Sequence, residues 1–166
     1  MIMDLLDIEN ANILVIDDEK INLELIEKLL KKNGFSNINL FPEAVEALEY
    51  YQKTPPDLVL LDINMSGLSG FDVLQRFEDI HHTPQPPVLA ITVLTDRKMR
   101  LQALKLGIRD FINKPFDDEE TIMRMRNSLK MHLAHKENIE YSQTLEELVQ
   151  YRTKDLLETQ NEMIER

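Results

Sequence analysis

The chain has 166 residues, of which 43% are hydrophobic and none is cysteine, so it is long enough for one ordinary domain with an appendage and cannot form disulfides. Its formal net charge of −11 argues against direct binding of nucleic acid or of an anionic membrane surface. There is no basic-then-apolar leader and no run of roughly 18 or more apolar residues, and a cytoplasmic protein is therefore expected.

Residues 1–9 are expected to form a flexible N-terminus, and after them five short runs rich in apolar and β-branched residues predict strands. The runs are Asn12–Asp17, Asn37–Phe41, Asp57–Asp62, Pro87–Thr92 and Ile108–Asn113. The first, third and fourth are continuous in apolar residues, which is typical of strands covered on both faces of a sheet. The second is short and polar, so it is expected at an edge.

Between these strands, apolar residues recur at helical spacing and predict four helices. The apolar positions are Ile21, Leu25, Ile26, Leu29 and Leu30; Ala44, Val45, Ala47, Leu48 and Tyr51; Phe71, Val73, Leu74 and Phe77; and Met99, Leu101, Ala103 and Leu104. Strands that alternate with helices in this way indicate an α/β fold with a doubly wound, five-stranded parallel sheet.

In open α/β sheets the functional site lies beyond the carboxyl ends of the strands. The predicted strands end in Asp17-Asp18, Asp62, Thr92 and Asn113, and Lys114-Pro115 follows the last of these. Each residue alone has a structural explanation; Asp18, for example, could cap the following helix. Their joint placement at successive strand ends favours a functional site.

Several carboxylates at one edge of a sheet need a compensating charge. Two of them about 4 Å apart repel by roughly 4 kcal/mol at an effective dielectric near 20. Oxygen ligands, without histidine or cysteine in the pattern, favour Mg²⁺. A bound cation would attract a phosphoryl group, and one carboxylate could then act as the nucleophile and form an aspartyl phosphate.

These residues resemble the receiver domain of bacterial two-component response regulators. The flanking segments "ILVIDDEKIN", "PDLVLLDINMSGLSGFDVL" and "LGIRDFINKPF" agree with the resemblance, which covers residues 10–126. It implies a flavodoxin-like fold and a phosphorylation switch rather than an enzyme. The phosphoryl donor would be a histidine kinase or a phosphotransfer protein.

The resemblance implies that Asp62 is the phosphorylation site and that Mg²⁺ lies beside it. Asp18 would bind the ion directly and Asp17 mainly through water. The main-chain carbonyl of Asn64 would supply a further ligand.

Three other positions receive roles from the same resemblance. Thr92 would follow the phosphoryl group by a hydrogen bond, and Lys114 would pair with it, with a cis peptide bond between Lys114 and Pro115. Phe111 would be the switch aromatic that changes rotamer on activation, although it could also be a plain core residue.

The sequence departs from the usual receiver pattern at two positions. Ser66 stands where the family usually has proline, and Val93 stands where it favours alanine. The bulk of Val93 puts the rate of dephosphorylation in question. His81 and His82 lie in a polar loop without partner ligands and are interpreted as solvated.

Two alternatives use similar residue types. A small phosphohydrolase of the haloacid-dehalogenase type also uses Asp, Thr or Ser, Lys and Mg²⁺, but its nucleophile lies on the first strand. A flavodoxin-like FMN binder is disfavoured because Asp17-Asp18 would repel the phosphate. Turnover of a generic phosphate ester would separate an enzyme from a switch.

The segment from Glu119 to Arg166 contains neither glycine nor proline and predicts one long helix. Its first turns are expected to pack on the domain through Ile122, Met125 and Leu129. Residues 127–166 then form an extended helix or coiled-coil linker. Alternating spacings of four and three predict a heptad seam and a parallel homodimer; the alternative is a frayed linker. The seam positions are Leu145, Val149, Arg152, Leu156, Thr159 and Met163.

The segment "LEELVQYRTKDLLETQNEMIER" is most similar to linkers that precede HD-GYP cyclic-di-GMP phosphodiesterase domains. Similar linkers precede other output domains as well. None of the residues that an HD-GYP domain needs is present here, so the output activity is expected to lie outside this chain.

Overall fold

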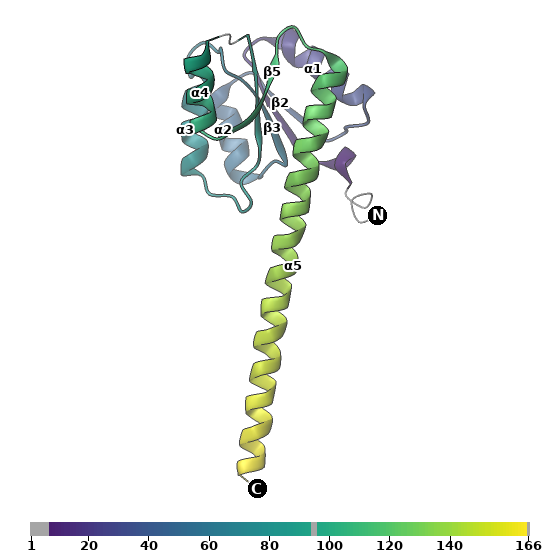
Figure 1. Cartoon of the computed structure of the whole chain (residues 1–166), viewed down its shortest axis with the longest axis vertical. Coiled ribbons are helices and arrows are strands. Elements are labelled where there is room, and N and C mark those ends of the chain that lie inside the picture. The colour runs from purple at the N-terminus through teal and green to yellow at the C-terminus, as the bar shows by residue number, and fades with distance from the viewer. Residues whose placement is uncertain (1–6, 94–95, 166) are drawn as a thin grey trace.

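A computed structural model describes residues 7–93 and 96–165. Its strands form one parallel sheet with the order β2-β1-β3-β4-β5 (Figure 1). The strands are β1 (Ile13–Ile16), β2 (Ile38–Phe41), β3 (Leu58–Asp62), β4 (Val88–Thr92) and β5 (Ile108–Asn113). The first four begin one residue later than predicted, β1 also ends one residue earlier, and β2 lies at an edge as predicted. The flavodoxin-like doubly wound fold is therefore confirmed.

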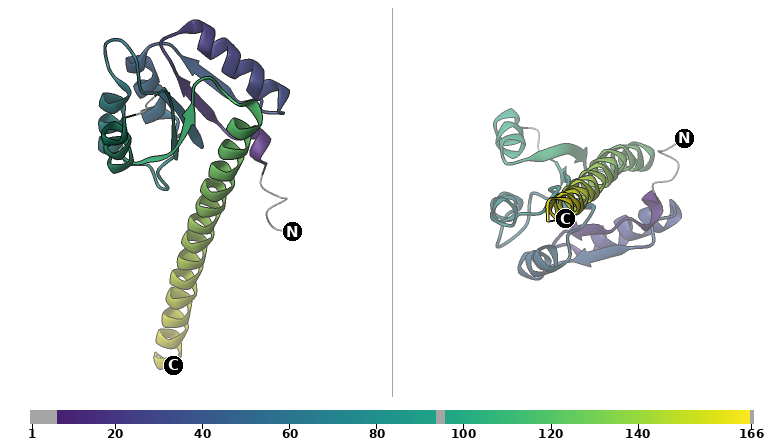
Figure 2. Two further views of the ribbon diagram at one scale, coloured as in Figure 1. Left: turned by 45° about the horizontal axis from the view of Figure 1, so that its top comes forward. Right: turned by 90° about the horizontal axis from the view of Figure 1, so that it is seen from below.

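The helices cover both faces of this sheet (Figures 1 and 2). They are η2 (Ile8–Asn10), α1 (Lys20–Lys32), α2 (Ala44–Lys53), α3 (Gly70–Asp79), α4 (Arg97–Lys105) and α5 (Asp118–Ile164). Alternate residues of β1 point to opposite faces: Ile13 and Val15 join the core under α1 and α5, whereas Leu14 and Ile16 join the core under α2, α3 and α4. This two-sided burial explains the continuous apolar runs in the sequence.

Two predicted apolar stripes are wider than the helix faces that the fold buries. In α1, Ile21 and Leu25 are 64% and 52% exposed, and Leu23 is buried instead. In α4, Leu101 and Leu104 are exposed, whereas Ala103 is fully buried. A surface helix buries only the residues that face the sheet. The spacing of apolar residues in the sequence did not show which of them those would be.

Helix α5 is a single helix of 47 residues, about 70 Å long at 1.5 Å per residue. Ile122, Met125 and Leu129 are buried on the sheet, as predicted. Every residue from Glu140 to Glu165 is exposed, and Figures 1 and 2 show this part projecting far beyond the domain. No helix within the described residues is both long and apolar enough to span a membrane.

The N-terminus and the loop before Pro84 differ in part from what the sequence predicts. Of the N-terminus predicted to be flexible, residues 1–6 lie outside the described residues, and Ile8 is buried against the core under α1 and α5. His82 is not simply solvated as predicted: it is half-buried, and its Nε2 lies 2.7 Å from the carbonyl oxygen of Tyr51. The loop that carries it contains a cis peptide bond between Thr83 and Pro84 that was not predicted.

Candidate functional site

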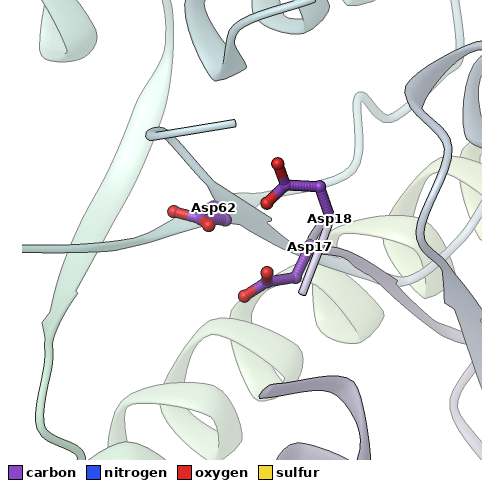
Figure 3. A group of neighbouring side chains, drawn as sticks. All are labelled: Asp17, Asp18 and Asp62. Atoms are coloured by element: carbon purple, nitrogen blue, oxygen red, sulfur yellow. The ribbon is translucent and has the colours of Figure 1, made fainter. Parts of the chain in front are cut away.

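The three acidic residues predicted from the strand ends meet at one edge of the sheet. The parallel pairing of β1 with β3 sets Ile16 opposite Leu61, so Asp17 follows at the level of Asp62. One carboxylate oxygen from each of Asp17, Asp18 and Asp62 lies within 4.8 Å of the others (Figure 3). Asp17 is fully buried and Asp62 is 1% exposed, so little water separates their charges.

Burial, and after it the neighbouring charge of Asp17, raise the pKa of Asp62 from 3.8 to about 6. Two groups act in the opposite direction. The Asn64 N–H donates to Asp62 Oδ1 at 3.1 Å, and Lys114 Nζ lies 3.3 Å from Asp62 Oδ2. Asp62 is therefore a buried carboxylate that carries its charge at neutral pH against an unfavourable environment.

Asp17 offers an oxygen suited to a cation. The Glu19 N–H donates to Asp17 Oδ1 at 2.9 Å. Asp17 Oδ2 is buried without a hydrogen-bond partner among the described residues, and Lys114 Nζ lies 3.6 Å from it. A buried acceptor of this kind is costly unless it is compensated. The carboxylate oxygens of Asp17, Asp18 and Asp62 are hard donors, and a group of three such donors fits Mg²⁺.

Asp18 is held by Ser66, one of the two departures noted in the sequence. Both the N–H and the hydroxyl of Ser66 donate to Asp18 Oδ2 at 2.9 Å. These bonds, the backbone bond first, hold the pKa of Asp18 below its ordinary value. A proline at position 66 would have neither donor. Sequence reasoning noticed the serine but did not predict these bonds.

Thr92 ends β4, the strand next to β3, and Lys114 follows β5, the strand beyond it. Thr92 is 1% exposed, and its carbonyl accepts a hydrogen bond from the Lys114 N–H at 3.1 Å. The predicted cis peptide bond between Lys114 and Pro115 is present. The Lys114 ammonium reaches both Asp17 and Asp62. The roles that the resemblance assigns to Thr92, Lys114 and the Asn64 carbonyl remain predictions.

Phe111 lies in β5 and is 8% exposed. Its ring belongs to the core under α2, α3 and α4, and the Arg100 guanidinium lies 4.9 Å from the ring centre. Both a core role and a switch role agree with this position, so the switch role remains a prediction.

Gly70 supports the site and was missed by sequence reasoning. It is the first residue of α3, and a Cβ at this position would lie 2.6 Å from Ile63 Cα and 2.8 Å from the Asp62 carbonyl oxygen. Only glycine lets the helix approach the backbone that follows Asp62 this closely. The Ser69 and Asp72 capping box in front of it was a sequence signal for this helix start.

Comparison with known proteins agrees with this geometry. The family model described as the response regulator receiver domain matches residues 13–126. The Bacillus subtilis transcriptional regulatory protein YvrH is 34% identical over 129 residues, which are 78% of this chain and 53% of YvrH. The response regulator PleD of Caulobacter vibrioides is 34% identical over 125 residues, 75% of this chain and 27% of PleD.

The fold also matches solved structures. The crystal structure of NtrX from Brucella abortus superimposes with a TM-score of 0.70 at 29% identity, covering 80% of this chain and 29% of NtrX. The chain thus spans about half the length of YvrH and about a quarter of PleD. The similarity concerns the shared domain and does not extend to the other parts of these proteins.

Proposed function

This chain belongs to the response regulator receiver domain family of two-component systems, and on that premise we propose that Asp62 is its phosphoacceptor. Receiver domains are phosphoacceptor switches rather than enzymes, which sets aside the phosphohydrolase and FMN-binding alternatives. The observation that carries the proposal is the burial of Asp62 between a second carboxylate and the Lys114 ammonium. A desolvated carboxylate with a raised pKa is a stronger nucleophile than an ordinary one.

The proposed donor is the phosphohistidine of a histidine kinase or a phosphotransfer protein. A carboxylate oxygen of Asp62 attacks the phosphorus, and a P–O bond forms while the P–N bond breaks. The electron pair of the P–N bond returns to the donor imidazole. Lys114 pairs with the incoming phosphoryl oxygens, and the Thr92 hydroxyl donates a hydrogen bond to one of them.

Asp17, Asp18, Asp62 and the Asn64 carbonyl would hold Mg²⁺. When bound, the ion neutralises charge that develops on the transferred group. Two observations support this assignment: Asp17 Oδ2 accepts no hydrogen bond within the described residues, and three carboxylates crowd together beside it. Ser66 orients Asp18 by its two hydrogen bonds.

Intact-mass measurement of the chain with Mg²⁺ and a small phosphodonor such as acetyl phosphate tests the assignment. One phosphoryl group per chain is expected, and Asp62→Asn should gain none because an amide is not a nucleophile. Asp79→Asn, on the exposed end of α3, is the matched control and should label fully. Equal labelling of Asp62→Asn would move the phosphorylation site elsewhere.

The extension of α5 is proposed to pair with that of a second copy in parallel. Its seam residues Leu145, Val149, Leu156 and Met163 are 44%, 62%, 66% and 67% exposed. A lone helix this long and exposed is poorly supported in water, and pairing the apolar stripe stabilises it. The dimer would present two output domains side by side in the cytoplasm, with HD-GYP domains as the output class that the linker most resembles.

Light scattering on two lysine variants tests this pairing. Leu156→Lys places charge in the seam and should yield a monomer at micromolar concentration. Leu157→Lys changes the adjacent residue, which is also exposed but lies off the seam, and should remain a dimer. If both variants remain dimers, the interface lies elsewhere and the coiled-coil interpretation is wrong.

A further inference from the structure

A second buried carboxylate lies at the opposite end of the strand that carries Asp62. Asp57 immediately precedes β3 and is 9% exposed. The Asn12 N–H donates to Asp57 Oδ2 at 2.9 Å, and the Asp57 N–H donates to the Asn12 carbonyl at 2.8 Å. One oxygen of Asp57 thus joins the starts of β1 and β3.

The other oxygen of Asp57 faces helix α5. His132 Nε2 lies 3.7 Å and Lys136 Nζ lies 3.5 Å from Asp57 Oδ1. His132 is 7% exposed, whereas every residue from Glu140 to Glu165 is exposed. The contact therefore lies where α5 leaves the domain.

Apolar packing alone does not fix the direction of this exit. The contacts of Ile122, Met125 and Leu129 with the sheet are non-directional, and they allow a helix to tilt or turn at small cost. A second polar anchor, from Arg126 Nη2 to the Asn33 carbonyl at 2.9 Å, lies nearer the start of α5. Two polar anchors at different points along one helix determine its direction.

We propose that Asp57, His132 and Lys136 form a polar clasp, with Lys136 as the ion-pair partner of Asp57, that fixes the direction in which α5 leaves the receiver. The clasp makes β3 and α5 one rigid body. Because β3 ends in Asp62, a displacement of this strand would move the extension of α5 with it. No flexible joint between them would absorb the motion. This regulatory consequence rests on the proposed function, whereas the clasp itself does not.

Distance measurement between two spin labels on the full chain tests the clasp. The sequence contains no cysteine, so labels attach only where cysteine is introduced. Lys53→Cys at the end of α2 and Gln143→Cys on the extension are both exposed, and position 143 lies off the proposed seam. Dilution of labelled chain with excess unlabelled chain removes distances between copies.

Two variants weaken the clasp from its two sides. Asp57→Asn removes the charge but keeps an oxygen that can accept from the Asn12 N–H. Lys136→Met acts only on the helix, where the lysine side chain is 47% exposed, so folding is not at risk. Lys154→Met is the matched control, because Lys154 lies on the same helix beyond the receiver with its side chain 77% exposed.

The unmodified chain and Lys154→Met should give one narrow distance distribution. Asp57→Asn should broaden it about twofold, with a smaller change for Lys136→Met, because local motion rises where a buried polar anchor is lost. Distributions for both clasp variants that equal the control would overturn the proposal. Repeating the measurement after phosphorylation tests the proposed function separately: an unchanged distance in the phosphorylated chain would count against signalling through α5 and leave the clasp standing.

Discussion

The two buried aspartates of the β3 segment differ in how their charges are compensated. Asp57, at the start, gives one oxygen to the Asn12 N–H and the other to His132 and Lys136. Asp62, at the end, faces the buried carboxylate of Asp17 as well as the Lys114 ammonium. A buried charge that its neighbours compensate stabilises the fold. A buried charge that faces a like charge is only partly compensated, and it remains available for ligand binding and chemistry.

The comparison predicts opposite stability changes when each charge is removed, and the larger is expected at Asp62. A shift of its pKa from 3.8 to about 6 corresponds to about 3 kcal/mol at about 1.36 kcal/mol per unit. Because the pKa of Asp62 is higher in the folded chain than in the unfolded chain, its protonated form contributes stability at pH values below 3.8. This stability is lost as the pH rises through about 6. Asp62→Asn should therefore raise the free energy of unfolding of the metal-free chain by up to about 3 kcal/mol near neutral pH.

Urea unfolding in the presence of a chelator measures this change. The gain should shrink as the pH falls below about 6 and approach zero at about pH 3, where Asp62 is protonated in both the folded and the unfolded states. A variant less stable than the unmodified chain at neutral pH would remove the distinction between the two aspartates.

Asp57→Asn should do the reverse and lower the free energy of unfolding by about 1 kcal/mol, because the Asn12 N–H then donates to a neutral acceptor instead of a charged one and the ion pair with Lys136 is lost. Asp79→Asn, on an exposed helix end, should change it little. Urea unfolding of both variants near neutral pH gives the comparison. No loss in Asp57→Asn relative to Asp79→Asn would mean that the clasp adds nothing to stability.

His132 should make the clasp end of the molecule sensitive to acid. Burial lowers the pKa of His132, although the charge of Asp57 raises it in part; Lys136, His135 and Arg109 lower it further. The pKa of His132 in the folded chain is lower than its value of 6.5 in the unfolded chain. The neutral imidazole therefore contributes stability at pH values above 6.5, and this stability is lost as the pH falls through the folded pKa.

The unmodified chain should therefore lose stability relative to His132→Gln as pH falls from about 7.5 to about 5.5. Thermal unfolding of both proteins at the two pH values measures the difference. His135→Gln is a matched control on the same helix, because His135 is exposed. A parallel pH dependence of the unmodified chain and His132→Gln would contradict the assignment.

The smallest effect is expected at Ser66. Ser66→Ala removes the hydroxyl donor to Asp18 but keeps the backbone donor. Mg²⁺ affinity, measured by titration calorimetry, should fall by less than about tenfold, the lower end for loss of a group that orients a metal ligand. Ser142→Ala, on the exposed extension, should bind Mg²⁺ like the unmodified chain, and an equal affinity for Ser66→Ala would show that the hydroxyl does not orient Asp18.

The sequence by itself was sufficient to predict the strands, the helices and the meeting of three aspartates. Apolar periodicity is a local property, and in a parallel sheet every strand delivers its last residues to the same edge. Asp17, Asp18 and Asp62 could therefore be brought together without knowledge of any side-chain contact. The long helix followed from the lack of glycine and proline after Glu119.

Only the tertiary structure decided which polar groups became partners. Ser66 meets Asp18, His82 meets the Tyr51 carbonyl, and Asp57 meets α5, although each pair is far apart in the sequence. Such pairs depend on how the helices lie across the sheet, and a periodic pattern does not contain that information. The same limit applies to Ile21 and Leu25, which have helical spacing but lie outside the stripe of α1 that packs on the sheet.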